Sequence, residues 1–465
     1  MSTANRTARD PIFERHQSVV WPNNLLTTLI ASAAMLPPIV FIAALIWRYG
    51  VNVPFWDEWS LIDLFEHAQA HKLSLADFVA QNNEHRLVFP KLIFLVIEQT
   101  ASWNPRVEMF LSVLLCAAGA FVLQWMVRRT LQLSRLGTLV IAFVMSLLLF
   151  SPCQHENWLW GYQLGCFLLN LCVIAGVAVP CLNVRRTAKF FMAATCAVVA
   201  TFSGGNGITL WPSLLLAFLL TSNKQDTSGA IWWTTSWTAT GLCAVALYYF
   251  HYRQPSWHPP LAASRNALDY LCYLTAFVGC PLTRRSDTAL LASSICVGSI
   301  EIGLFLFFVG LLVRRGRRTS AALSRGAPWV AIGTYSLLTA FMACIARIGF
   351  GKTQALASRY TTFSLLLLVS LIPLGLLAET TLQEGKAVVL RTLNRTLFAV
   401  AILLLVTTFP FGLRMMRTSG EMRRKGRIAL PFLIAFQKRK SFKPQSFPAS
   451  LFSLTTLDVR MPCTC

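Results

Sequence analysis

The chain has 465 residues, of which 55% are hydrophobic and only 13% are charged, and its mean hydropathy is +0.56. About a quarter of the residues of a soluble domain are charged, so this composition excludes a soluble globular protein. Long unbroken apolar runs also exclude a barrel of short alternating strands. We therefore predict an all-α fold, a polytopic transmembrane helical bundle of about eleven spans.

The net charge of +22 does not indicate a nucleic-acid partner in a chain this apolar. Basic residues of membrane proteins gather in cytoplasmic loops that face anionic lipid. On this rule, the arginines before the first apolar run (about Leu25–Trp47) place the N-terminus in the cytoplasm. We expect a multi-pass protein of the cytoplasmic (inner) membrane. Its first outer loop covers residues 48–106 and holds short interfacial helices at Leu61–Ala70 and Leu87–Gln99.

The remaining hydrophobic runs alternate with short polar connections and predict further helices. A glycine-rich stretch, Ser203–Gly207, separates two of them and predicts a tight break that is buried in protein or lines a wet cavity. The predicted runs are Val107–Val127, Leu136–Phe150, Tyr162–Leu182, Phe190–Phe202, Ile208–Leu220, Ala230–Phe250, Ala289–Val313, Trp329–Gly349, Phe363–Leu377 and Leu397–Leu413.

The end of the chain conflicts with the orientation rule. We divide the chain into a membrane domain, residues 1–413, and a basic tail, residues 414–465. The span count leaves this tail outside, although basic residues favour the inside. Two alternatives remain open: one crossing is miscounted, most plausibly near Ala267–Cys280, or the tail lies along the outer surface as a basic interfacial helix.

Acidic residues, which are scarce in the chain, concentrate in the first outer loop. Asp57 and Glu58 lie between two tryptophans, and Glu84 follows near the end of the loop. A carboxylate at the membrane interface is partly desolvated and can act as a general base. The same acids could belong to an ordinary solvated loop, but the tryptophan flanks and the scarcity of acids elsewhere favour a functional role for Asp57.

This arrangement resembles the GT-C superfamily of membrane glycosyltransferases. The shared features are a first span, a long outer loop with an acidic pair (Asp57–Glu58), short juxtamembrane helices, a later acid such as Glu84 and many further spans. The superfamily includes aminoarabinose transferases, protein O-mannosyltransferases and bacterial lipopolysaccharide core or mannosyl transferases. The resemblance covers the topology of roughly the first half of the chain. The sequence shows no counterpart of the large soluble domain that some members carry.

The resemblance implies inverting transfer of a sugar from a polyprenyl-phosphate donor to a lipid, glycan or protein acceptor on the outer face of the membrane. Asp57 would be the general base, and Glu58 or Glu84 would orient the acceptor or assist. Cations would hold the phosphate that leaves. Our first choice is Arg359 beside Tyr360, because a guanidinium can bind phosphate through two hydrogen bonds, although it could equally snorkel at the interface. Further candidates are Lys352, Arg347, Arg86 and His85.

Aromatic and amide side chains near the predicted outer face could bind the sugar, because rings offer apolar faces and amides bind hydroxyls. More often, such a cluster is only the aromatic belt of a membrane protein. The candidates are Asn157, Trp158, Trp160, Gln163 and Asn206. We expect no metal ion or other cofactor, because the acids show no recognisable metal-binding spacing; a divalent cation is the open alternative.

Two other functions compete with the transferase. A transporter or flippase would show paired broken helices and several ionisable residues inside spans, but only the Ser203–Gly207 break and Glu301 qualify. A polysaccharide polymerase or ligase would carry its decisive outer loop late in the chain, whereas the acidic loop here comes first.

Overall fold

Most of the predicted apolar runs form helices. The computed structural model describes residues 25–221, 227–284, 289–316, 320–380, 382 and 384–439; the arginines before the first span lie outside these ranges. The longer helices are α2 (Leu25–Tyr49), α6 (Pro105–Thr130), α7 (Arg135–Leu149), α9 (Leu164–Ala178), α10 (Arg186–Thr201), α11 (Leu210–Thr221), α12 (Thr227–Tyr249), α13 (Ala267–Thr283), α14 (Leu290–Gly316), α15 (Ser320–Arg347), α16 (Thr361–Glu379) and α17 (Glu384–Arg439).

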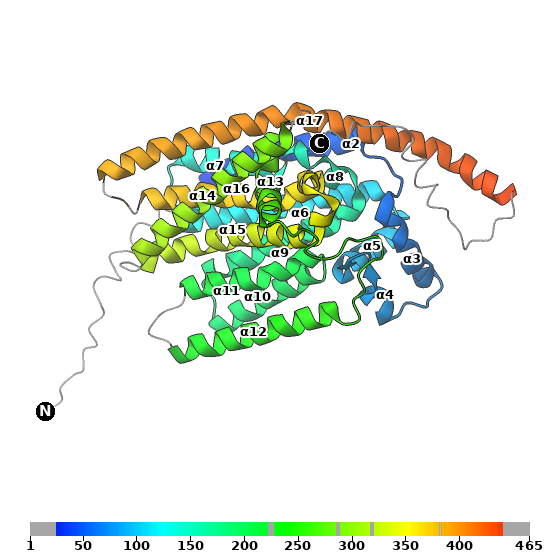
Figure 1. Cartoon of the computed structure of the whole chain (residues 1–465), viewed down its shortest axis with the longest axis horizontal. Coiled ribbons are helices and arrows are strands. Elements are labelled where there is room, and N and C mark those ends of the chain that lie inside the picture. Colours follow the sequence, from blue (N-terminus) through cyan, green and yellow to red (C-terminus); the bar gives the residue numbers. More distant parts are fainter. Residues whose placement is uncertain are drawn as a thin grey trace.

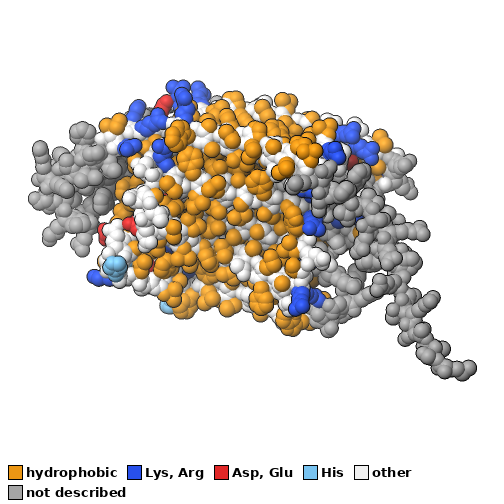
Figure 2. Space-filling model, turned by 180° about the vertical axis from the view of Figure 1, so that it is seen from behind, with side chains coloured by type: hydrophobic (Ala, Val, Ile, Leu, Met, Phe, Trp, Pro, Cys, Tyr) orange, Lys and Arg blue, Asp and Glu red, His pale blue; other side chains and the backbone are white. Residues whose placement is uncertain are grey.

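The helices pack side by side with many of their axes along the long dimension of the molecule (Figure 1). In the described part of the chain, eight of them are long and apolar enough to cross a membrane. One face is covered with hydrophobic side chains, and Lys and Arg gather toward its two ends (Figure 2). This confirms the predicted all-α membrane bundle, whereas the total of about eleven spans stays a prediction.

The residues between α2 and α6 form a small layer of their own at one end of the bundle, called the loop end below. Figure 1 shows α3, α4 and α5 together at this end. Leu61, Leu64 and Phe65 pack there against Phe94 and Trp160 in a cluster separate from the main core. The elements of this layer are η1 (Trp56–Leu61), α3 (Ile62–Gln69), α4 (Leu75–Val79), β1 (Gln81–Asn82), β2 (His85–Arg86) and α5 (Val88–Ala101).

The predicted glycine-rich break separates α10 from α11. The chain turns at Ser203 and Gly204 into the short helix η5 (Gly205–Thr209), closed by a hydrogen bond from the Gly207 N–H to the Gly204 carbonyl (2.9 Å). A Cβ atom on Gly207 would collide with the backbone of Ala200. Only glycine therefore allows this tight return, which brings the turn into the wall of a cavity.

Helix α13 lies at the loop end. Near its start, Asp269 pairs with Lys352 (3.0 Å), and just past its end Arg284 donates to the Leu356 carbonyl (2.6 Å). Both partners belong to one short element, η7 (Lys352–Leu356), in the connection between α15 and α16. Figure 1 shows α13 nearly end-on, whereas α12 and α15 run across the view. The segment in which we allowed for a miscounted crossing therefore forms a helix that does not run parallel to α12 and α15, and the number of spans stays a prediction.

Helix α17 continues without a break through Arg414, where we placed the start of a separate tail. Its 56 residues give a length of about 84 Å, against a hydrocarbon core of about 30 Å. Gly420 packs against the Tyr49 carbonyl at the end of α2, and Arg424 donates to the Arg48 carbonyl. The basic stretch after Arg414 therefore lies at the loop end, and Figure 1 shows α17 reaching beyond it.

Helix α16 lies in the middle of the bundle, with 89% of its most apolar stretch buried. Polar groups of neighbouring helices bond to its first turn. Ser336 donates to the Phe363 carbonyl (2.9 Å), Asn170 donates to the Thr362 carbonyl (2.9 Å), and the Thr362 hydroxyl donates to Gln154 (2.5 Å). These bonds fix the end of α16 that approaches the loop end.

Candidate functional site

A cavity of about 640 Å³ opens at the loop end between segments from both halves of the chain. The first outer loop supplies Asp57, Glu84 and His85, and the end of α15 with the following connection supplies Arg347 and Arg359. The loop after α12 closes another side. Nine of the fourteen predicted site residues line this cavity: Asp57, Glu84, His85, Trp160, Gln163, Asn206, Arg347, Arg359 and Tyr360.

Asp57 and Glu58 are adjacent in η1 but have different surroundings. Glu58 is buried and accepts hydrogen bonds from the backbone N–H groups of Phe55 (2.6 Å) and Tyr162 (3.0 Å). It anchors η1 beneath the cavity and does not line it. Asp57 is half-buried on the cavity wall, and within the described residues no group donates a hydrogen bond to its carboxylate. It lies close enough to His85 and Arg347 for its negative charge to act on both groups.

The backbone before both cavity acids is strained. Trp56, just before Asp57, has φ +47°, and Asn83, just before Glu84, has φ +50°. Left-handed conformations are rare for a residue as bulky as tryptophan, and such strain concentrates at functional sites. Trp56 is held by its neighbours, since its ring stacks on Phe55 (4.8 Å between centroids) and meets the edge of Trp160 (5.5 Å).

Glu84 is the centre of a charged cluster. Its carboxylate forms an ion pair with Arg347, and it lies 3.0 Å from the Nε2 atom of His258 and 3.6 Å from that of His85. Desolvation lowers the pKa of His85 to about 4, and the nearby Asp57 charge opposes this shift. His85 is therefore neutral at pH 7, whereas Arg347 brings positive charge to Glu84.

Arg359 is held at the cavity by the segment before α9. Its backbone N–H donates to Glu156 (3.0 Å), and its carbonyl accepts from Asn157 (3.0 Å). The next residue, Tyr360, stacks on Phe277 of α13 (5.1 Å between centroids). The backbone of this arginine is thus fixed on two sides, and its guanidinium remains on the cavity wall.

The polar turn between α10 and α11 also lines the cavity. The Gly205 N–H donates to Nδ1 of His85 (3.3 Å), and the Asn206 amide donates to the Tyr335 hydroxyl (3.0 Å). Gln163 and Trp160 line the cavity from the segment that opens α9. Amide, imidazole and indole groups therefore line the same cavity as the acids and offer both hydrogen-bonding groups and apolar ring faces.

Five predicted site residues lie outside the cavity lining. Glu58 is one of them. Arg86 donates to the carbonyls of Tyr248 (2.6 Å), Val79 and Phe250, which ties the first outer loop to the end of α12. Lys352 is exposed and paired with Asp269. Asn157 and Trp158 are fully buried, Asn157 against Arg359 and Thr362 and Trp158 against the Ser151 carbonyl.

Sequence reasoning missed the contribution of the loop after α12. Tyr252, Gln254, Trp257 and His258 line the cavity, and the His258 side chain is only 3% exposed. The available signal was the segment HYRQPSWHPP, in which prolines restrict a stretch rich in aromatic and imidazole groups. Nothing in that pattern indicated that it faces the first outer loop.

No metal centre is evident in the described ranges, where no group of three or more His, Cys, Asp or Glu side chains is placed to hold an ion. The expectation of a reaction without a metal ion stays a prediction.

Apolar helices and an apolar surface with charges toward its ends define the chain as a multi-pass membrane protein. Its loop end carries a charged cavity built from distant parts of the sequence. Comparison with protein-family models, with curated proteins and with solved structures finds no match.

Proposed function

We propose that the protein is an inverting membrane glycosyltransferase of the GT-C type that moves a sugar from a polyprenyl-phosphate donor to a lipid, glycan or protein acceptor. One observation carries the proposal. Asp57, a carboxylate without a hydrogen-bond donor among the described residues, lines the same cavity as Arg347 and Arg359, which lie about three hundred residues further along the chain.

In the proposed reaction, the acceptor oxygen forms a bond to the anomeric carbon of the sugar while the bond from that carbon to the phosphate oxygen breaks. Asp57 receives the proton of the acceptor hydroxyl, and polyprenyl phosphate leaves with the bonding electrons. A positioned carboxylate contributes about 10²- to 10⁴-fold in rate to such a step. Glu84 holds Arg347 in place and, with His258 and His85 beside it, can orient the acceptor.

The leaving phosphate gains negative charge, so cations on the cavity wall favour the transition state. Arg359 is the stronger candidate, because its backbone is fixed by Glu156 and Asn157 and no carboxylate among the described residues pairs with its guanidinium. Arg347 already pairs with Glu84. Trp160, Gln163 and Asn206 are placed to contact the sugar.

The lipid chain of the donor needs a path from the membrane to the cavity. Tyr249, Trp257, Leu261 and Phe350 line the cavity and are also exposed, from 41% to 61%. Apolar side chains that belong both to the cavity and to the outer surface suit the entry of a polyprenyl chain. We assign the loop end to the outer face of the cytoplasmic membrane, with the N-terminus cytoplasmic, because basic residues end α6 and begin α10 at the other end.

The test uses a radiolabelled polyprenyl-phosphate sugar and membranes that contain the protein. We expect Asp57→Asn to lower transfer by about 10²- to 10⁴-fold at an unchanged protein level, because amide nitrogen cannot accept the proton. Asp63→Asn, which changes an exposed acid of α3, is the matched control and keeps full activity. Arg359→Ala should raise the donor KM by about tenfold or more, since a charge-assisted hydrogen bond is lost.

Two results would contradict the proposal. Full transfer by Asp57→Asn would remove this residue from the mechanism. Movement of the labelled lipid across vesicles that contain the purified protein, without any glycosylated product in the presence of acceptor, would instead identify a flippase.

A further inference from the structure

One side of α17 and the adjoining end of α2 carry exposed cations at the loop end. We propose that this surface, which consists of Arg48, Arg414 and Lys425 and is called the basic surface below, binds the phosphate groups of anionic membrane lipids. The proposal does not depend on the proposed reaction, nor on which side of the membrane the loop end faces.

Helix geometry puts two of these cations on the lipid-facing side of α17. At about 3.6 residues per turn, Arg414 and Lys425 fall on the same side of the helix as Leu403, which is 64% exposed in the apolar part of α17. Arg423 falls on the opposite side and contacts Phe55 of the first outer loop. The lipid-facing side of α17 therefore continues from apolar residues into cations.

Contacts with α2 place the basic surface at the depth of lipid headgroups. Trp47, near the end of α2, is 72% exposed, and tryptophan favours the headgroup region. Arg424 donates to the Arg48 carbonyl, so this part of α17 is level with the end of α2. Lys425 follows directly. Arg414 lies about 15 Å earlier along the helix axis, and its long side chain can extend toward the headgroups.

The positive charge of this surface is not neutralised by its surroundings. Its three cations are exposed, and no carboxylate in the described ranges pairs with them. The acid closest in sequence, Glu421, pairs with Arg417 (2.8 Å). The segments outside the described ranges cannot supply an excess of acid, because each holds at least as many Lys and Arg residues as Asp and Glu residues.

Apolar side chains beside the cations favour a lipid over a soluble polyanion. Met422 and Ile428 are 41% and 69% exposed on the same stretch of α17. Figure 2 shows Lys and Arg side chains gathered next to the hydrophobic face toward the ends of the molecule. A lipid offers acyl chains to the apolar groups and a phosphate to the cations, whereas a soluble polyanion would leave the apolar groups in water.

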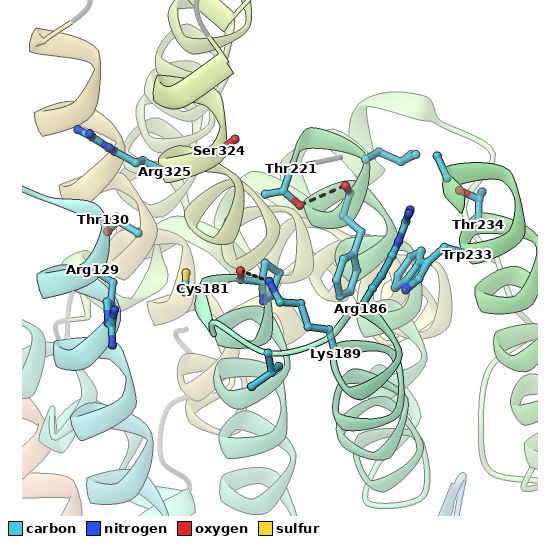
Figure 3. Close-up of a pocket in the computed structure, with 15 residues that line it drawn as sticks. Arg129, Thr130, Cys181, Arg186, Lys189, Thr221, Trp233, Thr234, Ser324 and Arg325 are labelled. Atoms are coloured by element: carbon cyan, nitrogen blue, oxygen red, sulfur yellow. Dashed lines mark hydrogen bonds between the residues drawn. The ribbon is translucent and has the colours of Figure 1, made fainter. Parts of the chain in front are cut away.

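The other end of the bundle arranges its cations differently. A second cavity, of about 590 Å³, lies there and is lined by basic side chains from three helices (Figure 3): Arg129, Arg186, Lys189 and Arg325. The basic surface faces outward instead, and none of its residues lines either cavity. A test at the basic surface therefore addresses a site separate from both.

The test identifies the lipids beside α17 in nanodiscs that hold the full chain with equal amounts of phosphatidylglycerol and phosphatidylcholine of the same acyl chains. A photoreactive benzoylphenylalanine replaces Ile428 in the parent chain and in both variants, and mass spectrometry measures the ratio of the two lipid adducts. The test variant removes the three cations of the basic surface: Arg48→Gln, Arg414→Gln and Lys425→Gln. The control removes the same charge from other exposed positions at the loop end: Lys72→Gln, Arg253→Gln and Arg265→Gln. Thermal midpoints show whether each variant is folded.

A cation close to an anionic lipid surface strengthens binding by about fivefold. We expect phosphatidylglycerol adducts to exceed phosphatidylcholine adducts by about fivefold or more in the parent chain and in the control, and the ratio to approach one in the test variant. About 1 M NaCl should lower the ratio in the parent chain, because salt screens exposed charges.

Three results would overturn the proposal. The first is a ratio near one in the parent chain, or equal ratios in the test and control variants. The second is a preference that sodium phosphate abolishes but sodium chloride of the same ionic strength does not, which would assign the surface to free phosphate. The third is the absence of any lipid adduct together with binding of polyphosphate that the test variant loses, which would identify a soluble polyanion as the partner.

Discussion

At the scale of single residues, Glu58 shows how burial assigns a role to an acid. Its carboxyl group is 1% exposed and lies against Glu108, and a Cβ on Gly161 would contact Glu58 at 2.7 Å. Desolvation raises the pKa of Glu58 from 4.5 to about 7. Two buried carboxyl groups in contact are stable only while they hold a proton between them. Glu58 therefore anchors η1 best in its protonated form.

This predicts a pH dependence of stability. Between about pH 4.5 and 7, folded Glu58 keeps its proton while the unfolded chain has lost it, so the folded state binds more protons and stability falls as pH rises. We expect the thermal midpoint of the purified protein to fall from pH 5 to pH 8, and Glu58→Gln to reduce this fall. Glu66→Gln, at an exposed position of α3, should leave the slope unchanged. Equal slopes for wild type and Glu58→Gln would contradict the prediction.

Single residues were predictable only in part. The scarcity of acids singled out Asp57 and Glu84, and both line the cavity. The sequence could not distinguish the role of Arg86 from that of Arg347, because each role depends on tertiary contacts. Arg86 donates to three backbone carbonyls, whereas Arg347 pairs with the carboxylate of Glu84. His258 was missed for the same reason, since its approach to Glu84 depends on how two loops meet.

At the scale of elements, α17 contributes to the site from a distance. Arg423 lies 4.1 Å from the ring centroid of Phe55 and donates to the Leu159 carbonyl. It also lies near the Glu58 carboxyl group. Phe55 and Leu159 flank the two segments that carry Asp57 and Trp160. Arg423 therefore connects α17 to both walls of the cavity without lining it.

This connection predicts a positioning role for Arg423. Under the proposed function, we expect Arg423→Met to lower kcat by about tenfold or more with little change in the donor KM, because η1 and Asp57 lose a fixed geometry while Arg347 and Arg359, the arginines proposed to bind phosphate, stay. Arg423→Lys should restore part of the rate. Arg427→Met, an exposed position on the same helix, is the control. A loss confined to KM would argue against positioning.

Hydropathy was a good guide to the elements themselves. The run predicted at Leu25–Trp47 forms α2, and the glycine-rich break between α10 and α11 is found where predicted. The orientation of α13 and the continuation of α17 could not be read from composition. An apolar run of this length does not fix the direction of its helix, which depends on packing against η7 and α14.

At the scale of the whole molecule, the two cavities lie at opposite ends, and α17 carries its basic stretch to the loop end. With the loop end outside, as we propose, its charge opposes that placement under the positive-inside rule, but contacts of Gly420 and Arg424 with the end of α2 hold it there. The packing of α17 on α2 therefore determines where the charged stretch lies.

This arrangement predicts which positions share a side of the membrane. In a variant with Cys243, Cys296, Cys463 and Cys465 replaced by serine, a membrane-impermeant maleimide should label Lys425→Cys and Glu66→Cys from the same side. It should label Arg186→Cys only from the other side. Labelling of Lys425→Cys together with Arg186→Cys in sealed vesicles of one orientation would contradict the placement of α17.

The central position of α16 has a consequence for biogenesis. The amide groups of Gln154, Asn157 and Asn170 find their partners at Thr362, which the ribosome adds some two hundred residues later. Until then the buried amides of Asn157 and Asn170 lack these partners. We therefore expect the earlier helices to reach their final packing only after α16 has been inserted.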